Sequence, residues 1–412
     1  MSAQAANQEP IRPDKVWQAT ATPPPVTAPS EQGLRSVKPP APRRITDSRA
    51  ERLAAAEDLK TDCQEHDESR RPEGWARNRF EQCFLGKRKV HLLSRQSGVI
   101  VATIEFEYSL LAFAVDGSRK VNYVFDFDDF DTSGGEPLQI TTLTVDFAGC
   151  GGVVACSPDP PLASKLVPDW QFGNRHFEFS ISSPNEAGDG TFLIARSLIQ
   201  MNMSIVTVAP DVLPWREAVM TSSRVRFDSA KSALGAGKFY GAVFSDHVPT
   251  LEFDKRPGSA YLEEARHIDD ALHSPWRTFP SFAGKSVPGE GARPLHRLMN
   301  ATLKDKNNEV SVGICKDVWG AGYAAGGREC DEFPFKTTYE GSATSTGATQ
   351  DNPNGGNGSA WHGSARPISG AHNSAGGTHL LVFLGQNRVL DENVGTALEG
   401  TPSDPYLVKV LS

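Results

Sequence analysis

Large apolar residues alternate with polar ones over much of the chain between residues 75 and 285. A period of two places all apolar residues of a run on one face of a β-strand. Turn-forming Gly, Pro, Asp and Asn separate the runs, so the pattern predicts an antiparallel sandwich or barrel. The clearest runs are Ile100, Ala102, Ile104, Phe106 and Tyr108; Tyr123, Phe125 and Phe127; Leu143, Val145 and Phe147; and Phe177, Phe179 and Ile181.

The N-terminal region has a different composition. Residues 1–45 are rich in Pro, Ala, Thr and Ser and contain almost no large apolar side chain. Such a segment cannot bury enough surface to offset the entropy lost on ordering. We expect residues 1–60 to be a disordered Pro-rich tail that ends in a short helix, because Ala, Leu, Glu and Arg follow a polar capping sequence at Thr46.

Glycines and prolines between residues 280 and 300 indicate a domain boundary. We therefore expect a β-rich domain of unknown role at 61–284 and a smaller domain at 285–412. The whole chain is expected to belong to the α+β class. In the smaller domain the apolar pattern predicts a strand at Val310–Cys315, a helix at Thr378–Leu384 and a closing strand at Tyr406–Leu411.

The six cysteines form three local pairs in the sequence. Nearest-neighbour pairing predicts the disulfides Cys63–Cys83, Cys150–Cys156 and Cys315–Cys330, although fifteen connectivities are possible. Zinc binding is the alternative, but the chain has no Cys-x-x-Cys and no compact Cys/His quartet. Disulfides indicate an oxidising compartment.

No apolar run reaches the length of about 18 residues that a membrane span requires, so none is predicted. The N-terminus, Met1 to Gln4, lacks the charged and apolar regions of a secretory signal. We expect a secreted protein whose signal peptide is absent from this chain or whose export follows another route.

A group of acids lies at the end of one expected strand of the β-rich domain. Asp126, Asp128, Asp129 and Asp131 could offer oxygens to calcium, but their spacing is not that of a calcium-binding loop with a distal Glu. The pattern favours a solvated acidic face.

The stretch with the strongest chemical interest runs from Cys330 to Phe335, Cys-Asp-Glu-Phe-Pro-Phe, and is followed by Tyr339-Glu340-Gly341. Proline disfavours helix at and just before itself, so Asp331 and Glu332 should lie on an extended segment. Adjacent strand residues face opposite sides, so at most one of the two carboxylates points into any one cavity. Such a pair can act as a general base or bind a metal, or it can be a solvated acidic turn.

The complete pattern resembles the signature of the NucA/NucB family of secreted deoxyribonucleases, (R/C)-D-E-(Y/W/F)-P-(F/M)-A-x-x-x-E-G. The resemblance continues with His372-Asn373, Gly376-Gly377 and a final Asp404-Pro405-Tyr406-Leu407-Val408, and it covers residues 285–412. It implies a small ββα-metal-type nuclease domain that requires a divalent cation, Mg²⁺ or Mn²⁺. In this fold a hairpin supplies the base and the following helix supplies a metal ligand.

The resemblance also implies roles for individual residues. Asp331 matches the acid that serves as the base. Glu332 and Glu340 match the other signature carboxylates, which bind the metal or hold the hairpin. Asn373 matches the asparagine at the start of the helix, an orienting group or metal ligand.

The sequence departs from the family pattern at three points. His372 stands where an acid often precedes the asparagine, and it is either a proton carrier or a surface residue. Lys336 replaces the usual alanine and could contact a phosphate. Between Thr378 and Arg388 there is no acid of the kind some members carry in the helix, and the next acids are Asp391 and Glu392. The metal is therefore held differently here, or the site is weakened.

These observations predict a secreted metal-dependent endonuclease that hydrolyses DNA with little sequence specificity. The formal net charge of −8, with 11 Lys and Arg against 13 Asp and Glu from residue 285 onward, provides no general attraction to nucleic acid. A non-catalytic secreted binding or surface protein with a decayed nuclease-like module is the alternative. A nuclease toxin would share the chemistry and would need an inhibitor protein.

Overall fold

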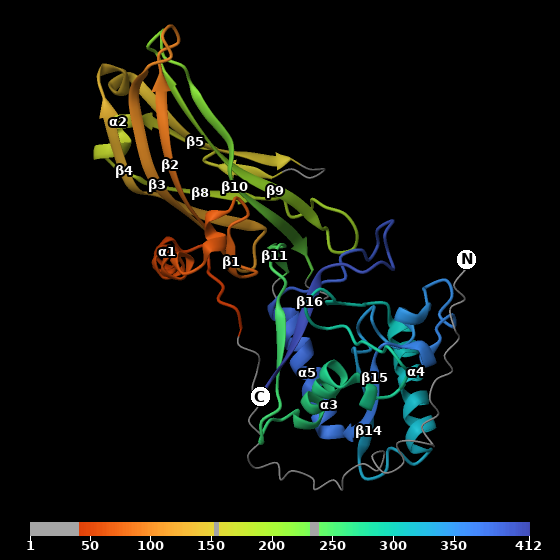
Figure 1. Cartoon of the computed structure of the whole chain (residues 1–412). Helices are drawn as coiled ribbons and strands as arrows, with labels where there is room; N and C mark the ends of the chain where they lie inside the picture. The colour runs from red at the N-terminus through yellow and green to blue at the C-terminus, as the bar shows by residue number, and fades with distance from the viewer. Residues whose placement is uncertain (1–40, 152–155, 231–238) are drawn as a thin grey trace, which may run out of the picture. The chain divides into compact units, whose positions relative to one another are not determined.

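The structure is a computed structural model that describes residues 41–151, 156–230 and 239–412. These residues form two compact units, Pro42–His247 and Val248–Ser412 (Figure 1). The expected Pro-rich tail at residues 1–40 lies outside the described residues. Each unit has its own hydrophobic core, and each is described here by itself.

The first unit contains two antiparallel sheets. One sheet has the strand order β1-β2-β3-β4-β8-β6 and the other β11-β10-β9-β5-β7. The strands are β1 Trp75–Asn78, β2 Glu81–Leu93, β3 Ile100–Ala114, β4 Lys120–Gly134, β5 Thr141–Gly151, β6 Ser157–Asp159, β7 Leu162–Leu166, β8 His176–Ser182, β9 Ala195–Thr207, β10 Trp215–Ser229 and β11 Tyr240–Phe244.

The alternating apolar residues form the core between these sheets. Phe106 and Phe125 from one sheet and Val145 from the other belong to one buried cluster. Tyr123 stacks on Phe179 with 4.8 Å between ring centroids. The predicted antiparallel, sandwich-like arrangement is therefore confirmed for this unit, because one face of each strand run is removed from water.

The predicted short helix is present as α1, Arg49–Gln64, capped by Ser48. Its apolar side packs on the six-stranded sheet, and Leu59 is fully buried there. The Cys63–Cys83 disulfide fixes its C-terminal end. Arg52 donates to Glu178 of β8 at 2.7 Å, so α1 is held by a covalent bond, apolar packing and a charge-assisted hydrogen bond.

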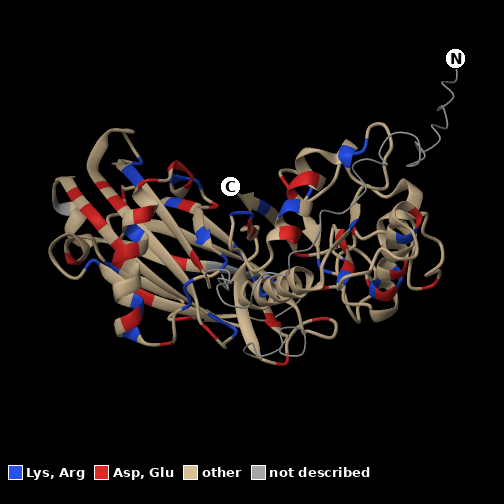
Figure 2. Cartoon of the chain, turned by 90° about the horizontal axis from the view of Figure 1, so that it is seen from below, with Lys and Arg blue, Asp and Glu red and all other residues tan. Residues whose placement is uncertain are grey.

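The acids of β4 are engaged by neighbouring side chains. His176 lies 2.9 Å from Asp126, and Lys60 of α1 forms an ion pair with Asp128. Figure 2 shows acidic and basic positions interspersed on the strands of this unit. Ion pairing within the unit therefore accounts for part of the acidic group, whereas Asp129 and Asp131 are exposed as expected for a solvated face.

The second unit combines three helices with two small sheets. Its elements are β12 Thr250–Asp254, α3 Leu262–His273, β13 Leu295–His296, α4 Ala301–Trp319, β14 Arg328–Phe333, β15 Ser364–Ser369, α5 Gly370–Gln386 and β16 Pro405–Leu411. The sheet order is β12-β16-β13, with β12 and β16 parallel, and β14 and β15 form an antiparallel pair. The helix expected at Thr378–Leu384 and the strand expected at Tyr406–Leu411 are confirmed.

The division between the units lies at residue 247, not at 284. Residues 248–284 contribute β12 and α3 to the second unit, where Leu251, Ile268 and Phe383 share one core. The Gly- and Pro-rich segment at 280–300 is therefore a connection inside this unit.

The predicted strand at Val310–Cys315 is wrong, because these residues belong to helix α4. The buried positions of this helix are Leu303, Asn307, Ser311 and Cys315, spaced four residues apart. Two of them are polar, so the buried face has no apolar signature. The valines at 310 and 312 instead imitate a period of two.

Two of the predicted disulfides are present, Cys63–Cys83 and Cys315–Cys330. For the third predicted pair, Cys150–Cys156, the side chain of Cys150 lies outside the described part of the chain. Within that part, no helix is both long and apolar enough to cross a membrane.

Acid should weaken the first unit through Glu178. Burial alone would raise the pKa of this carboxyl, but hydrogen bonds from Arg52, His176 and Arg49 outweigh it and lower the pKa to about 2. Because the unfolded group titrates near 4.5, the stabilisation is complete above that pH and is lost as the pH falls from about 4.5 to 2.

We expect Glu178→Gln to lower the free energy of unfolding at pH 7 by about 1–2 kcal/mol, solvent screening included, and to flatten its acid dependence. Urea unfolding followed at several pH values measures both effects. Glu57→Gln, at an exposed position on α1, is the control. An unchanged pH slope in Glu178→Gln would contradict the assignment.

Candidate functional site

The signature acids lie on a hairpin that leads directly into a helix. In the antiparallel pair of β14 and β15, Asp331 lies opposite Arg366. Helix α5 begins at Gly370, immediately after β15 ends at Ser369. Helix α3 packs against both hairpin strands and α5, and the Cys315–Cys330 disulfide fastens β14 to α4. The residue next to the disulfide, Asp331, is thereby held on a braced strand.

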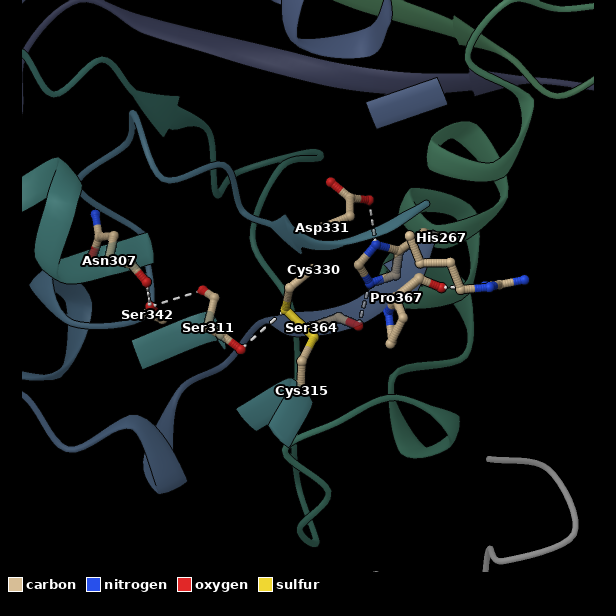
Figure 3. The surroundings of a disulfide bond; sticks show 10 residues. His267, Asn307, Ser311, Cys315, Cys330, Asp331, Ser342, Ser364 and Pro367 are labelled. Atoms are coloured by element: carbon tan, nitrogen blue, oxygen red, sulfur yellow. Dashed lines mark hydrogen bonds and ion pairs between the residues drawn. A yellow bond between two sulfur atoms is a disulfide. The ribbon is translucent and has the colours of Figure 1, made fainter. Parts of the chain in front are cut away.

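Asp331 takes part in a buried chain of hydrogen bonds. Its Oδ2 lies 2.6 Å from Nδ1 of His267 on α3, and Nε2 of His267 lies 2.6 Å from Oγ of Ser364 on β15 (Figure 3). Asp331 is 5%, His267 0% and Ser364 1% exposed. The three groups therefore fix one another in orientation.

The protonation of His267 follows from its surroundings. Burial lowers the pKa of His267 and outweighs the opposing effect of Asp331, so the ring is neutral at pH 7. A neutral ring has one donor and one acceptor nitrogen. Nδ1–H therefore donates to Asp331, and Nε2 accepts the hydroxyl proton of Ser364.

The order carboxylate, imidazole, hydroxyl is that of serine hydrolases. Here the hydroxyl of Ser364 is almost completely enclosed, and this excludes it as a nucleophile for an external substrate. The chain instead orients Asp331, whose second oxygen, Oδ1, points away from the ring in Figure 3.

A second carboxylate lies on the same side of α3. Glu264 precedes His267 by one helical turn, is 2% exposed, and its Oε2 has no hydrogen-bond partner among the described residues. It lies directly against Gly376 of α5, where a Cβ would come within 1.5 Å of Oε2. Burial, and then the charges of Asp331 and Glu332, raise the pKa of Glu264 well above its usual range.

Glu332 has a different environment from Asp331, as the alternation of strand residues predicts. It accepts a hydrogen bond from the backbone of Lys336, at the turn that follows β14. Burial, and then the neighbouring charge of Asp331, raise its pKa to about 8. In this arrangement Glu332 stabilises the turn.

Glu340 is not brought to Asp331. Its two carboxylate oxygens accept hydrogen bonds from the backbone N–H and the ring of His296, at 2.9 and 2.8 Å, on β13. The following Gly341 lies against the buried side chain of Asn307, where a Cβ would come within 2.2 Å of Nδ2. The Glu-Gly pair of the signature therefore fastens the segment after the hairpin to β13 and α4.

The side chain of Asn307 fixes the backbone conformation of residues 336–344, which follow β14. Nδ2 donates to the carbonyls of Lys336 and Thr338 at 2.9 and 3.3 Å, and Oδ1 accepts from the N–H groups of Ala343 and Thr344 at 2.8 and 3.0 Å. The single Asn307 amide thus satisfies backbone carbonyl and N–H groups of residues that lie outside the strands.

The other predicted site residues have partners other than Asp331 or are exposed. The amide of Asn373 donates to Glu329 on β14 at 2.8 Å. His372 lies 3.6 Å from Glu263 of α3 and is nearly buried. The side chain of Lys336 is exposed. Arg366 faces Asp331 across the hairpin and donates to Asp270 at 2.7 Å.

No group of three or more His, Cys, Asp or Glu side chains converges as a ready-made metal site within the described ranges. His267 and Ser364, which form the hydrogen-bond chain with Asp331, and the buried Glu264 were absent from the sequence prediction. The available signal was an acid and a histidine three residues apart in a helical segment, which places both on one helix face. Comparisons with protein-family models, curated proteins and solved structures gave no match for this chain.

Two neighbouring glycines test the packing of Glu264. We expect Gly376→Ala to lower the free energy of unfolding by about 1–3 kcal/mol, because the new methyl group overlaps the buried carboxylate of Glu264. Gly377→Ala on the same helix meets nothing within 4 Å, and it should raise stability by about 0.5–1 kcal/mol. Chemical denaturation of both variants measures the difference, and equal effects would refute the contact.

Proposed function

We propose that the second unit is a metal-dependent endonuclease that hydrolyses DNA phosphodiester bonds with little sequence specificity, of the NucA/NucB type. The observation that carries the proposal is the position of the Asp331 carboxylate. It lies on a hairpin that leads into a helix, and the neutral, buried imidazole of His267 on α3 orients it. This is the order of elements that the sequence resemblance implies, and Asp331 is at the position of the base.

In the proposed reaction Asp331 accepts a proton from the attacking water. The hydrogen bond from His267 to Oδ2 directs Oδ1 toward the water, and the enclosed Ser364 fixes the tautomer of the ring that donates it. A bound Mg²⁺ or Mn²⁺ would offset the charge that develops on the phosphate.

Arg366 supports the same proposal from the opposite strand. Its guanidinium is partly exposed and lies across the hairpin from Asp331. Arginine recognises phosphate oxygens through two parallel hydrogen bonds. We assign it the role of holding the scissile phosphate, together with the exposed Lys336. The disulfides are in accord with secretion to an oxidising environment.

Specific observations also favour a second candidate function, a non-catalytic binding or surface protein. Two of the expected metal ligands are engaged elsewhere, Glu340 with His296 and Asn373 with Glu329. Figure 2 shows acidic and basic positions mixed along the ribbon of both units, and the formal net charge of −8 provides no general attraction to DNA. The experiment that follows separates the two functions.

We expect the full chain to nick and then degrade plasmid DNA in Mg²⁺ or Mn²⁺, and EDTA to abolish the reaction. Asp331→Asn should lower the rate by about 10²-fold or more, because removing a general base typically has an effect of this size. Agarose gels and a fluorescent oligonucleotide provide the measurement.

Asp351→Asn, an exposed position in the loop before β15, is the matched control and should keep full activity. Absence of cleavage with every divalent cation would refute the nuclease proposal. Tight, metal-independent retention on cell-wall or glycan resin that requires residues 75–247 would then favour the binding function.

A further inference from the structure

Glu264 is a buried carboxyl group with one oxygen that has no hydrogen-bond partner among the described residues. A charged carboxylate oxygen that is removed from water and has no hydrogen-bond partner destabilises the folded protein. Most such groups in proteins are paired with a donor, a water molecule or an ion. Oε2 of Glu264 has no donor among the described residues, so the group either takes up a proton, in line with its raised pKa, or binds a partner that these residues do not supply.

The fold places this oxygen beside the proposed reaction centre. Glu264 and His267 are three residues apart on α3 and therefore share one face of the helix. His267 contacts Asp331 at 2.6 Å, so the carboxylates of Glu264 and Asp331 are on the same side of β14. Burial, and then the charges of Asp331 and Glu332, raise the pKa of Glu264.

The position also accounts for the missing acid of α5. This helix has no acidic residue between Gly370 and Gln386. At Gly376 it lacks a side chain altogether, and the carboxylate of Glu264 fills that space. A carboxylate is therefore present at the surface of α5 although the sequence of α5 does not encode one.

We propose that Glu264 and Asp331 together hold one divalent cation of the Mg²⁺ or Mn²⁺ type. Glu264 binds it directly, as the ligand that α5 does not supply, and Asp331 reaches it through the water that its Oδ1 deprotonates. Mg²⁺ is usually held by one or two carboxylates and completes its shell with water and substrate phosphate oxygens, so one direct carboxylate is sufficient.

The donor set selects the class of metal. Both groups that hold the cation are carboxylates, the hard oxygen donors that Mg²⁺ and Mn²⁺ prefer. Zn²⁺ prefers nitrogen and sulfur ligands. Both ring nitrogens of His267 are already engaged, one by Asp331 and the other by Ser364, and both Cys315 and Cys330 are in a disulfide. The site should therefore discriminate against zinc.

The test measures Mn²⁺ binding to the full chain by electron paramagnetic resonance and calorimetry, without DNA. We expect one bound Mn²⁺ per chain, competed by Mg²⁺, and at least a tenfold loss of affinity in Glu264→Gln, which keeps the size of the side chain. Glu264→Asp, which keeps the charge but shortens the reach, should bind with intermediate affinity. Glu309→Gln on α4, whose side chain is 70% exposed, is the control and should bind like the wild type.

Because this inference rests on the proposed nuclease function, the outcomes must separate the two. Folded Glu264→Gln protein, checked by near-ultraviolet circular dichroism, that binds Mn²⁺ as tightly as the wild type and cleaves DNA normally would overturn the role of Glu264 and leave the nuclease intact. Mn²⁺ binding that requires Glu264 in a protein without cleavage would support the cation site and refute the nuclease. Wild-type protein that binds no Mn²⁺ would overturn the cation site.

Discussion

The main physical constraint on the second unit is that carboxylates are buried between α3, β14 and α5, where an uncompensated charge is unfavourable. Asp331 and Glu264 are almost completely buried. A buried carboxylate stays ionised only where a hydrogen-bond donor or a cation compensates its negative charge. Asp331 accepts a hydrogen bond from the N–H group of the neutral His267 ring. The other ring nitrogen accepts a hydrogen bond from the buried hydroxyl of Ser364. For Oε2 of Glu264 the described residues offer no donor, and a buried group of this kind marks a candidate functional site.

The surrounding structure keeps these groups from relaxing into solvent. The disulfide to Cys315 braces β14 beside Asp331, and the amide of Asn307 fixes the segment that follows the hairpin. Glu340 and Gly341 secure the same segment to β13 and α4. Several signature residues therefore maintain the shape of the hairpin, while the proposed chemistry is assigned to Asp331 on β14.

Local patterns in the sequence were sufficient for the strands of the first unit, for α1, for the helix within α5, for β16 and for two disulfides. They failed for α4, whose buried face contains Asn307 and Ser311 and so carries no apolar period. They also failed for His267 and Glu264, because these residues approach Asp331 only after α3 folds across the hairpin, 64 residues away in sequence in the case of His267. A single sequence contains no periodic signal for such a contact, and the Gly- and Pro-rich segment at 280–300 suggested a boundary between them.

The three-stranded sheet has a consequence for how this protein can be dissected. Its middle strand, β16, pairs in parallel with β12 and antiparallel with β13, so Leu407 is aligned with Thr250 from far upstream. A fragment started at residue 285 would lack a neighbour for the middle strand and also the helix that faces Asp331. Inactivity of such a truncated fragment would report on a broken scaffold and not on the chemistry of the intact chain.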